Sequence, residues 1–541
     1  MRGTDDTVPV PVLIVGAGAG GLSASALLAK HGVESLVVER RHEVFRYPKA
    51  RNLSFRTLEI LRGLGLGEAV HANGASVSNM VVKPTLNSAL ETQGLEVDAV
   101  FGGLDRVSPE PPVWYCPQSR LEPILLNYLR GSASRAWYGT ALEGFEQDRA
   151  GVTAVICHQE SSRRTRVRAD YLLAADGVNS GIRTDLGVTT SGYGPLPIYV
   201  VFIYFRAPWR TCLPDLHEGA AVGVKNHDVD GVFVPADGDL ALFVTTYLPT
   251  QGETAAEFTD RRCRELLLAA VGQSIELDVI EVVTWQPCER VADQFRCGRV
   301  LFVGDAAHAM PPFKAGGANV AIQSADNLSW KLAAVLGHSA GEELLDTYHA
   351  ERHPVGVLSA HQSLTGPPAA LLRCDPKRPP PKLDDEVSMF ALLTGYRYRS
   401  SAVIASDSCA SNAPDPELVD VLCGKPGTRV PHTWVEYQSR RASTLDLLGT
   451  GFTLLTGDDA SRWASASRDA EIDLTVRSIG RDGDALDLDG AWAATTGLNR
   501  QQALLVRPDA FVAWRSSVEP TNPGGELRTA LKGLLSSGIQ T

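Results

Sequence analysis

The sequence predicts an α/β protein of several domains, and three observations carry that prediction. An apolar strand runs into the glycine-rich turn Gly16–Gly21 and then into a helix. A second apolar strand, at 301–303, ends in Gly304–Asp305 and leads through a small-residue loop into another helix. Between them, 198–285 holds short β-branched and aromatic runs separated by turn residues. These patterns predict a Rossmann-like nucleotide-binding domain built from two parts of the chain and interleaved with an antiparallel-sheet domain.

The composition is that of a globular protein and argues against several partners. At 541 residues, 44% of them hydrophobic, the chain is long enough for about two to four domains. A net charge of −12 disfavours a nucleic-acid partner, which needs a basic face. No run reaches the ~20 apolar residues of a membrane span, and the first apolar run reads as a strand rather than a signal peptide. We therefore expect a cytoplasmic protein with no membrane contact. The nine cysteines form no C-x-x-C pair, so neither a metal site nor a disulfide framework is expected.

The glycine turn near the N-terminus has the pattern of a dinucleotide site. Gly16 permits the tight turn, Gly18 lets the backbone approach a pyrophosphate, and Gly21 lets helix and strand pack closely. The second strand, Ser35–Val38, ends in Glu39, which is placed to accept a hydrogen bond from an adenosine ribose. Such a turn serves FAD and NAD(P) equally, so it does not by itself choose the dinucleotide.

The later segment, 301–332, supplies a second set of contacts. Asp305, at a strand end, can accept hydrogen bonds from ribose-like hydroxyls, and the loop Gly316–Asn319 presents backbone N–H groups and the positive end of a helix dipole. This segment resembles the second FAD-binding motif of the flavoprotein aromatic hydroxylases. A third segment, Tyr171–Ser180, resembles their Asp-Gly motif and contains Asp176. The motifs occur in the family's order, and a flavin stretched across the domain needs contacts at both ends.

From Val8 to about Arg515 the chain resembles the FAD-dependent aromatic polyketide hydroxylases, which are class A flavoprotein monooxygenases related to phenol hydroxylase and para-hydroxybenzoate hydroxylase. The resemblance implies FAD as cofactor, NADPH or NADH as co-substrate, O2, and an aromatic, polyketide-derived small molecule as substrate. It implies that a flavin C4a-hydroperoxide hydroxylates the ring, with the protein positioning and desolvating the reactants. Together, the glycine turn and the resemblance place cofactor contacts at Gly16, Gly18, Gly21, Glu39, Arg40, Lys49, Arg51, Gln118, Leu142, Asp176, Asp305, Pro312, Gly317, Ala318 and Asn319.

Expected substrate contacts are fewer. The aromatic side chains of the middle region and one lysine are the candidates: Phe202, Tyr204, Phe233, Tyr247 and Lys314. No catalytic acid or base is assigned, and we expect His308 to be a structural turn residue because it lies at the ribityl end of the flavin.

The resemblance also predicts the domain limits. The FAD-binding domain takes 1–188 and, with a long helix, 291–375, and the antiparallel substrate domain takes 189–290. A Pro-rich linker at 376–410 precedes a thioredoxin-like C-terminal domain at 411–541, for which the lack of C-x-x-C predicts a structural or dimerising role.

Two departures from the family pattern leave alternatives open. Relatives usually have Gly-Gly where this chain has Lys314–Ala315, and often Asp where it has Ser324. Lys314 can point to solvent, meet an anionic substrate, or tune the flavin. The same motifs also suit a flavin-dependent oxidase or dehydrogenase, an oxidative-rearrangement, Baeyer–Villiger or epoxidising enzyme, or a non-catalytic FAD-binding protein. A halogenase is disfavoured because no W-x-W-x-I-P segment is present. The sequence leaves monomer and homodimer equally open.

Overall fold

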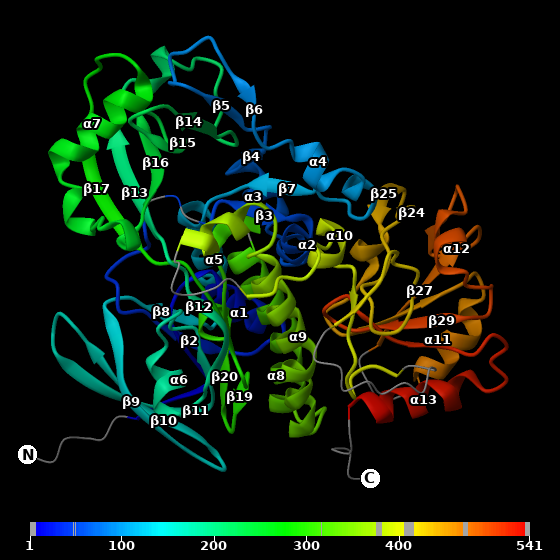
Figure 1. The fold of residues 1–541 in the computed structure, drawn as a ribbon. Coiled ribbons are helices and arrows are strands. Elements are labelled where there is room, and N and C mark those ends of the chain that lie inside the picture. Colours follow the sequence, from blue (N-terminus) through cyan, green and yellow to red (C-terminus); the bar gives the residue numbers. More distant parts are fainter. Residues whose placement is uncertain are drawn as a thin grey trace, which may run out of the picture.

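The computed structural model describes residues 7–46, 48, 50–314, 316–374, 381–404, 416–468 and 474–535. It is a mixed α/β fold with several sheets, arranged as a central body with one sheet domain above it and the C-terminal domain beside it (Figure 1). Among the described residues, no helix combines the length and the apolar character that crossing a membrane requires.

The central body is organised around an eight-stranded sheet. Its main path runs β19-β20-β11-β1-β2-β8, with β10 paired to β11 and β9 to β10. The apolar β1 is parallel to both β2 and β11, so its side chains are covered on both faces, as in doubly wound folds. The strands are β1 (Thr7–Val15), β2 (Ser35–Val38), β8 (Arg135–Trp137), β9 (Thr140–Asp148), β10 (Gly151–His158), β11 (Arg163–Ala174), β19 (Arg296–Cys297) and β20 (Val300–Phe302).

Helices cover this sheet, and two small three-stranded sheets flank it. The helices are α1 (Ala19–Lys30), α2 (Phe55–Gly63), α3 (Gly67–Ala72), α5 (Gln118–Leu129), α6 (Gly181–Asp185), α8 (Gly316–Leu336) and α9 (Asp346–Gln362). The small sheets are β3 (Asn52–Ser54) with β7 (Val113–Tyr115) and β4 (Ala75–Ser76), and β12 (Thr190–Pro195) with β18 (Cys288–Ala292) and β21 (His308–Ala309). Helices α1 and α8 approach closely, since a Cβ on Gly20 would lie 3.5 Å from that of Ala321.

The second domain is a seven-stranded sheet backed by α7 (Asp260–Val271). Its order is β17-β13-β16-β15-β14-β5-β6. The strands are β5 (Val81–Lys83), β6 (Thr92–Gln93), β13 (Tyr199–Arg206), β14 (Val222–Lys225), β15 (Asp230–Pro235), β16 (Leu240–Tyr247) and β17 (Asp278–Trp285), and α4 (Val97–Phe101) follows β6. Strands β5 and β6 come from the part of the chain expected in the nucleotide-binding domain, and β5 pairs with β14 in parallel, so the sheet is not antiparallel throughout.

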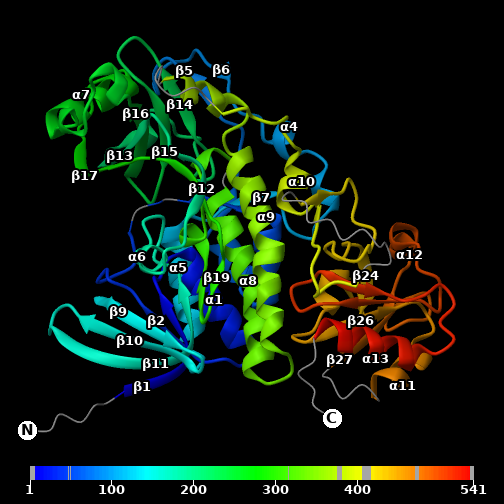
Figure 2. The ribbon, with the colours of Figure 1, turned by 60° about the horizontal axis from the view of Figure 1, so that its bottom comes forward.

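The C-terminal domain has its own seven-stranded sheet, ordered β25-β24-β28-β27-β26-β29-β30. Its elements are β24 (Trp434–Tyr437), β25 (Arg440–Ser443), β26 (Phe452–Thr456), α11 (Ala460–Arg468), β27 (Leu474–Gly480), β28 (Ala485–Leu486), α12 (Ala491–Thr496), β29 (Ala503–Val506), β30 (Val512–Arg515) and α13 (Pro523–Leu534). The described part of the connection to it contains α10 (Met389–Leu393) and β22 (Tyr396–Arg397), which pairs with β23 (Glu417–Leu418). Helices α8 and α9 stand between the central sheet and this domain in both ribbon views (Figures 1 and 2).

Candidate active site

The glycine turn closes tightly at two of its glycines and is open at the third. Gly16 has φ +110°, and a Cβ there would lie 2.2 Å from the Ala175 carbonyl oxygen. A Cβ on Gly21 would lie 2.0 Å from the Gly16 carbonyl oxygen. Gly18 has no neighbour closer than the Gln118 side chain, at 3.9 Å. The backbone at Gly18 is therefore accessible to a ligand, as the fingerprint requires.

Glu39 follows β2 and faces this turn with a buried carboxylate. One oxygen accepts from the Ala17 N–H (2.8 Å), and the other accepts from the Arg41 N–H (2.9 Å) and Nε (3.1 Å). Burial raises the pKa of Glu39, but the bonds from Arg41 and Ala17 outweigh burial and hold that pKa below its ordinary value. The carboxylate is therefore ionised. Arg41, which the sequence reasoning missed, orients it, whereas the side chain of Arg40 is exposed.

Two other elements border the same turn. Gln118 is the first residue of α5 and lies beside Gly18. Leu142 is partly buried on β9, whose first residue, Thr140, donates its N–H to the Glu39 carbonyl (2.8 Å). The structure thus brings Gln118 and Leu142 to the nucleotide-binding edge from separate parts of the chain.

The two basic residues expected at a pyrophosphate have different outcomes. Lys49 lies outside the described residues. Arg51 precedes β3, and its carbonyl accepts from the Cys116 N–H (2.8 Å), close to the start of α5. Burial lowers the pKa of Arg51, opposed by the nearby Tyr115 phenol. No hydrogen bond or ion pair joins its guanidinium to the described part of the chain, so this cation is available to an anionic ligand.

Asp176 and Asp305 follow neighbouring strands at the carboxyl edge of the sheet. Strands β11 and β20 are parallel, and the Val303 N–H donates to the Ala174 carbonyl (2.9 Å), which sets the two turns side by side. One oxygen of Asp176 accepts from the Ile182 N–H (3.2 Å), whereas the other is buried without a hydrogen-bond partner among the described residues. The Asp305 side chain is exposed at this edge. Ligands of open α/β sheets bind at such an edge.

The expected loop Gly316–Asn319 is the first turn of α8, and Asn319 holds it in place. Its Oδ1 accepts from the Ser54 N–H (2.9 Å) and the Thr57 hydroxyl (2.7 Å), and its Nδ2 donates to the Asn52 carbonyl (3.0 Å). The side chain therefore anchors the loop to β3 and α2, and only its backbone can face a cofactor.

The other residues around the start of α8 leave the backbone open. Pro312 is exposed, Gly317 and Ala318 are partly buried, and nothing lies within 4 Å of a Cβ built on Gly317.

Lys314 is already paired. Its Nζ lies 2.7 Å from the Glu386 carboxylate and donates to the Thr365 hydroxyl (2.8 Å). This role differs from the three that the sequence left open: Lys314 connects the loop before α8 to the segment before α10. Ala315, the other departure, lies outside the described residues.

The uncharged side chain of Ser324 lies between the buried side chains of His308 and Arg352. Its Oγ lies 3.1 Å from His308 Nε2 and accepts from Arg352 Nε (3.1 Å). Burial, with Arg352 nearby, lowers the pKa of His308 to about 3. His308 is therefore neutral at ordinary pH and fully buried, which agrees with a structural turn residue.

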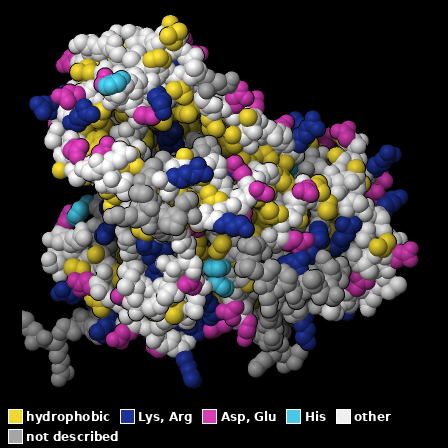
Figure 3. All heavy atoms as spheres, in the orientation of Figure 1, with side chains coloured by type: hydrophobic (Ala, Val, Ile, Leu, Met, Phe, Trp, Pro, Cys, Tyr) yellow, Lys and Arg dark blue, Asp and Glu magenta, His cyan; other side chains and the backbone are white. Residues whose placement is uncertain are grey.

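The four aromatic side chains expected at the substrate lie on opposite faces of the second sheet. Phe202 and Tyr204 lie on the face away from α7, and the Tyr204 hydroxyl donates to the Pro48 carbonyl of the central body (3.4 Å). Phe233 and Tyr247 pack on the other face with the core under α7. Residues alternate between faces along a strand, so these two are core residues, and their expected substrate contact is not supported. The molecular surface is hollowed beneath this sheet, and hydrophobic side chains gather along the hollow (Figure 3).

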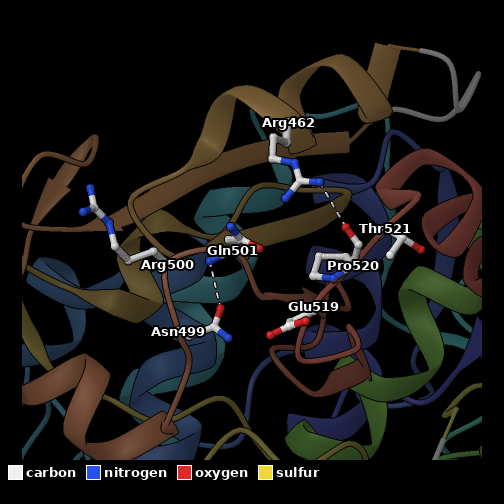
Figure 4. A pocket seen from close by; sticks show the side chains of 7 residues that line it. All are labelled: Arg462, Asn499, Arg500, Gln501, Glu519, Pro520 and Thr521. Carbon is white, nitrogen blue, oxygen red and sulfur yellow. Dashed lines mark hydrogen bonds between the residues drawn. The ribbon is translucent and has the colours of Figure 1, made fainter.

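A separate cleft of about 550 Å³ opens on the C-terminal domain (Figure 4). Its two arginines are engaged, since Arg462 donates to the Pro520 carbonyl (3.1 Å) and Arg500 lies 3.3 Å from Asp458. It contains none of the predicted site residues. The lining residues are Arg462, Asn499, Arg500, Gln501, Glu519, Pro520 and Thr521.

The polar groups along this edge of the central sheet fit a dinucleotide that carries a ring system at each of its two ends. An open glycine backbone, an ionised carboxylate at Glu39 and an uncompensated guanidinium at Arg51 suit a ribose and a pyrophosphate. The partnerless oxygen of Asp176 and the exposed Asp305 extend the same edge toward the loop before α8. Buried polar atoms normally have partners, so the Asp176 oxygen is itself an argument for a ligand.

Comparison with known proteins agrees with this geometry. Residues 9–363 match the family described as FAD binding domain, and residues 424–537 match the family described as aromatic-ring hydroxylase, C-terminal. The chain is 38% identical to tetracenomycin A2 monooxygenase-dioxygenase of Streptomyces glaucescens, over 98% of this chain and 97% of that protein. It is 34% identical to 4-methyl-5-nitrocatechol 5-monooxygenase of a Burkholderia species, over 98% of each chain.

The solved structures include aklavinone-11 hydroxylase in a ternary complex with FAD and aklavinone. It is 31% identical, with a TM-score of 0.87 over 98% of this chain and 100% of that one. The length of these matches and the geometry of the nucleotide edge lead to one conclusion: the chain belongs to the family of FAD-dependent aromatic-ring hydroxylases, the flavoprotein monooxygenases.

Proposed function

We propose that this monooxygenase hydroxylates a polycyclic aromatic polyketide in the biosynthesis of a secondary metabolite. The observation that carries the proposal is the apolar aromatic face of β13 and β17, which is turned away from α7 and connected to the central body at Tyr204. Flat apolar substrates are bound by such surfaces, with a few polar groups fixing orientation. Relatives named for tetracenomycin and aklavinone support a polycyclic substrate.

The residues of the nucleotide edge would hold FAD along its length. Glu39 would accept from the adenosine ribose, Arg51 would neutralise the pyrophosphate, and Asp305 would accept from the ribityl chain. FAD, when bound, supplies oxidation of NAD(P)H and activation of O2 for transfer of one oxygen atom to the substrate. Backbone N–H groups at Gly317 and Ala318 would stabilise negative charge that develops at the flavin's pyrimidine edge.

The rest of the site orients the substrate and excludes water. Phe202, which is partly exposed, would pack against the substrate rings, and the fully buried Tyr204 would hold it there through their edge-to-face contact (centroids 6.1 Å apart). No side chain is assigned as acid or base. His308 is buried and neutral and its Nε2 is engaged by Ser324, so it does not serve that role.

The remaining expectations are part of this proposal. The C-terminal domain is proposed to be thioredoxin-like and free of thiol chemistry, because 411–541 contains no C-x-x-C. The boundaries at 188, 290, 375 and 410 stay predictions, as do the cytoplasmic location and the choice between monomer and homodimer.

The test is substrate-dependent turnover of the reconstituted protein. We expect a yellow FAD complex whose NADPH oxidation rises with a polycyclic phenol and whose product gains one atom from isotopically labelled O2. A product without added oxygen would instead indicate an oxidase or dehydrogenase. Oxygen inserted into a ring or bound as an epoxide would indicate the Baeyer–Villiger or epoxidising alternative. A higher kcat/KM for 4-methyl-5-nitrocatechol than for polycyclic phenols would contradict the proposed substrate class.

A matched pair of variants at the two ends of β2 ties turnover to the nucleotide edge. Glu39→Gln removes a charged acceptor and should weaken FAD binding by about 10- to 100-fold, since a hydrogen bond to a charged group contributes about 1.5–3 kcal/mol. Glu34→Gln, which loses only a surface ion pair with Arg135 (2.8 Å), should bind FAD like the unaltered protein.

A further inference from the structure

The C-terminal domain contacts the central body through a network of buried charges. Glu351, on α9, is fully buried and accepts a bidentate pair of hydrogen bonds from the Arg507 guanidinium of the C-terminal domain, at 2.6 and 2.9 Å. The same carboxylate accepts from Lys331 of α8 (2.8 Å) and from Asn327 of α8 (2.6 Å). Arg507 is also bound by Asp509, on the same β29–β30 connection.

The network continues from the C-terminal domain to α2. The Asp509 carbonyl accepts from Arg56 Nη2 (2.8 Å), and the same nitrogen lies 3.0 Å from the Asp326 carboxylate on α8. Arg429 of the C-terminal domain donates to Glu59 of α2 (2.8 Å). All these groups are buried, so solvent does not screen their interactions.

The first turn and the middle of α8 are thus each held by buried polar contacts. Asn319, in its first turn, is bound to β3 and α2, and the Asn327–Lys331 stretch is bound to Glu351 and so to Arg507. Asn319 and Asn327 are about 12 Å apart along the axis at ~1.5 Å per residue. A helix is stiff over that length, so a displacement of α8 at the C-terminal contact would be passed to its first turn and to the loop before it.

Buried ion pairs are a poor source of stability, because desolvation offsets their attraction, but removing one partner leaves an uncompensated buried charge and is costly. Burial tends to lower the pKa of Lys331, and Glu351 opposes this, giving a value of about 8. Burial would raise the pKa of Glu351, but Arg507 and Lys331 hold it well below its usual range. Ionised groups packed this closely tolerate little displacement.

We propose that Arg507 is a positioning residue for the flavin site: through Glu351 it fixes α8, and with it the FAD-binding loop at its N-terminus. This inference deepens the proposed function and rests on it. It gives the C-terminal domain a role in cofactor binding and in the coupling of NADPH oxidation to product formation, beyond simple support of the fold.

The test uses the full chain in three variants. Arg507→Met/Glu351→Leu removes one cation and one anion together and so leaves Lys331 facing Asp509 with the charge balanced. Arg507→Lys keeps the charge and loses the two-pronged geometry. Arg515→Met is the matched control, since Arg515 lies on β30 of the same domain and, among the described residues, its guanidinium hydrogen-bonds only to the Thr496 and Gly497 carbonyls.

The expected result separates positioning from stability. The double variant should unfold near the unaltered protein's urea midpoint, while its dissociation constant for FAD rises about tenfold and more NADPH is consumed per product. Arg507→Lys should show smaller changes than the double variant in FAD affinity and in NADPH consumed per product. The absorbance band of bound flavin should shift in the double variant only.

Unchanged FAD affinity, spectrum and coupling in both Arg507 variants would overturn the inference. If the double variant does not fold, Arg507→Lys alone decides, on FAD affinity and on the NADPH consumed per product. Failure of the unaltered protein to bind FAD would instead refute the proposed function, so the two failures are distinguishable.

Discussion

Replacing Asn319 by alanine tests whether its side chain, rather than its place in the loop, builds the flavin-facing helix terminus. The substitution removes the bonds from Ser54 N–H (2.9 Å) and the Thr57 hydroxyl (2.7 Å) and the bond to the Asn52 carbonyl (3.0 Å). Thr57 retains Ser54 Oγ at 3.4 Å, so its hydroxyl keeps a partner. Two backbone groups lose theirs.

The magnitude follows from those two backbone groups. Leaving a buried donor or acceptor unsatisfied costs about 1–3 kcal/mol each, so the expected loss is about 2–6 kcal/mol, with the lower part of the range favoured because Asn52 is partly exposed to water. The loop before α8 would detach from β3 and α2. FAD affinity should fall with stability, because the same loop presents the backbone N–H groups.

The assay is urea unfolding followed by tryptophan and by released-flavin fluorescence, together with titration of apoprotein with FAD. Ser329→Ala is the control on the same helix, since Ser329 bonds mainly to the Ala325 carbonyl one turn back (2.7 Å) and its loss should cost about 1 kcal/mol or less. The reasoning is refuted if Asn319→Ala unfolds and binds FAD like the unaltered protein.

Three further predictions follow from the same geometry. Gly16→Ala should yield protein that neither folds stably nor binds FAD, because φ is +110° and the new Cβ would lie 2.2 Å from the Ala175 carbonyl oxygen; recovery of the yellow complex would contradict this. The pKa of His308 is about 3 in the folded protein, against 6.5 for an unperturbed histidine, so between these pH values only the unfolded chain binds the proton. The free energy of unfolding should therefore fall by about 1.4 kcal/mol per pH unit below pH 6.5, and urea midpoints at several pH values should show a shallower fall in His308→Gln. Lys314→Met removes a partly screened ion pair with Glu386 and should cost about 1 kcal/mol or less, with equal kcat/KM changes for anionic and neutral phenols; a selective loss for anionic phenols would show that Lys314 meets the substrate.

The sequence by itself determined the elements whose signals are local. A strand, a glycine turn, a helix and an acidic residue occur within about forty residues and specify the nucleotide edge, because each step follows from backbone geometry at adjacent positions. Asp176 and Asp305 were predictable for the same reason, since each follows an apolar strand directly. The chain-long resemblance then distinguished FAD from NAD(P), which the turn does not.

Only the tertiary structure decided the contacts between distant segments. Alternation along β15 and β16 shows that a strand has two faces, but which face meets α7 depends on packing, and that packing puts Phe233 and Tyr247 in the core. The anchoring role of the Asn319 side chain and the pairing of Lys314 with Glu386 involve partners far along the chain.

The charges at Glu351 and Arg507 illustrate the physical reason. In the sequence each is an ordinary charged residue of a helix or a loop, for which a solvated surface is the usual environment. Their burial against each other requires α9 and the β29–β30 connection to meet, more than 150 residues apart, at 2.6 Å. Such pairing is a property of how whole domains pack, and no local pattern encodes it.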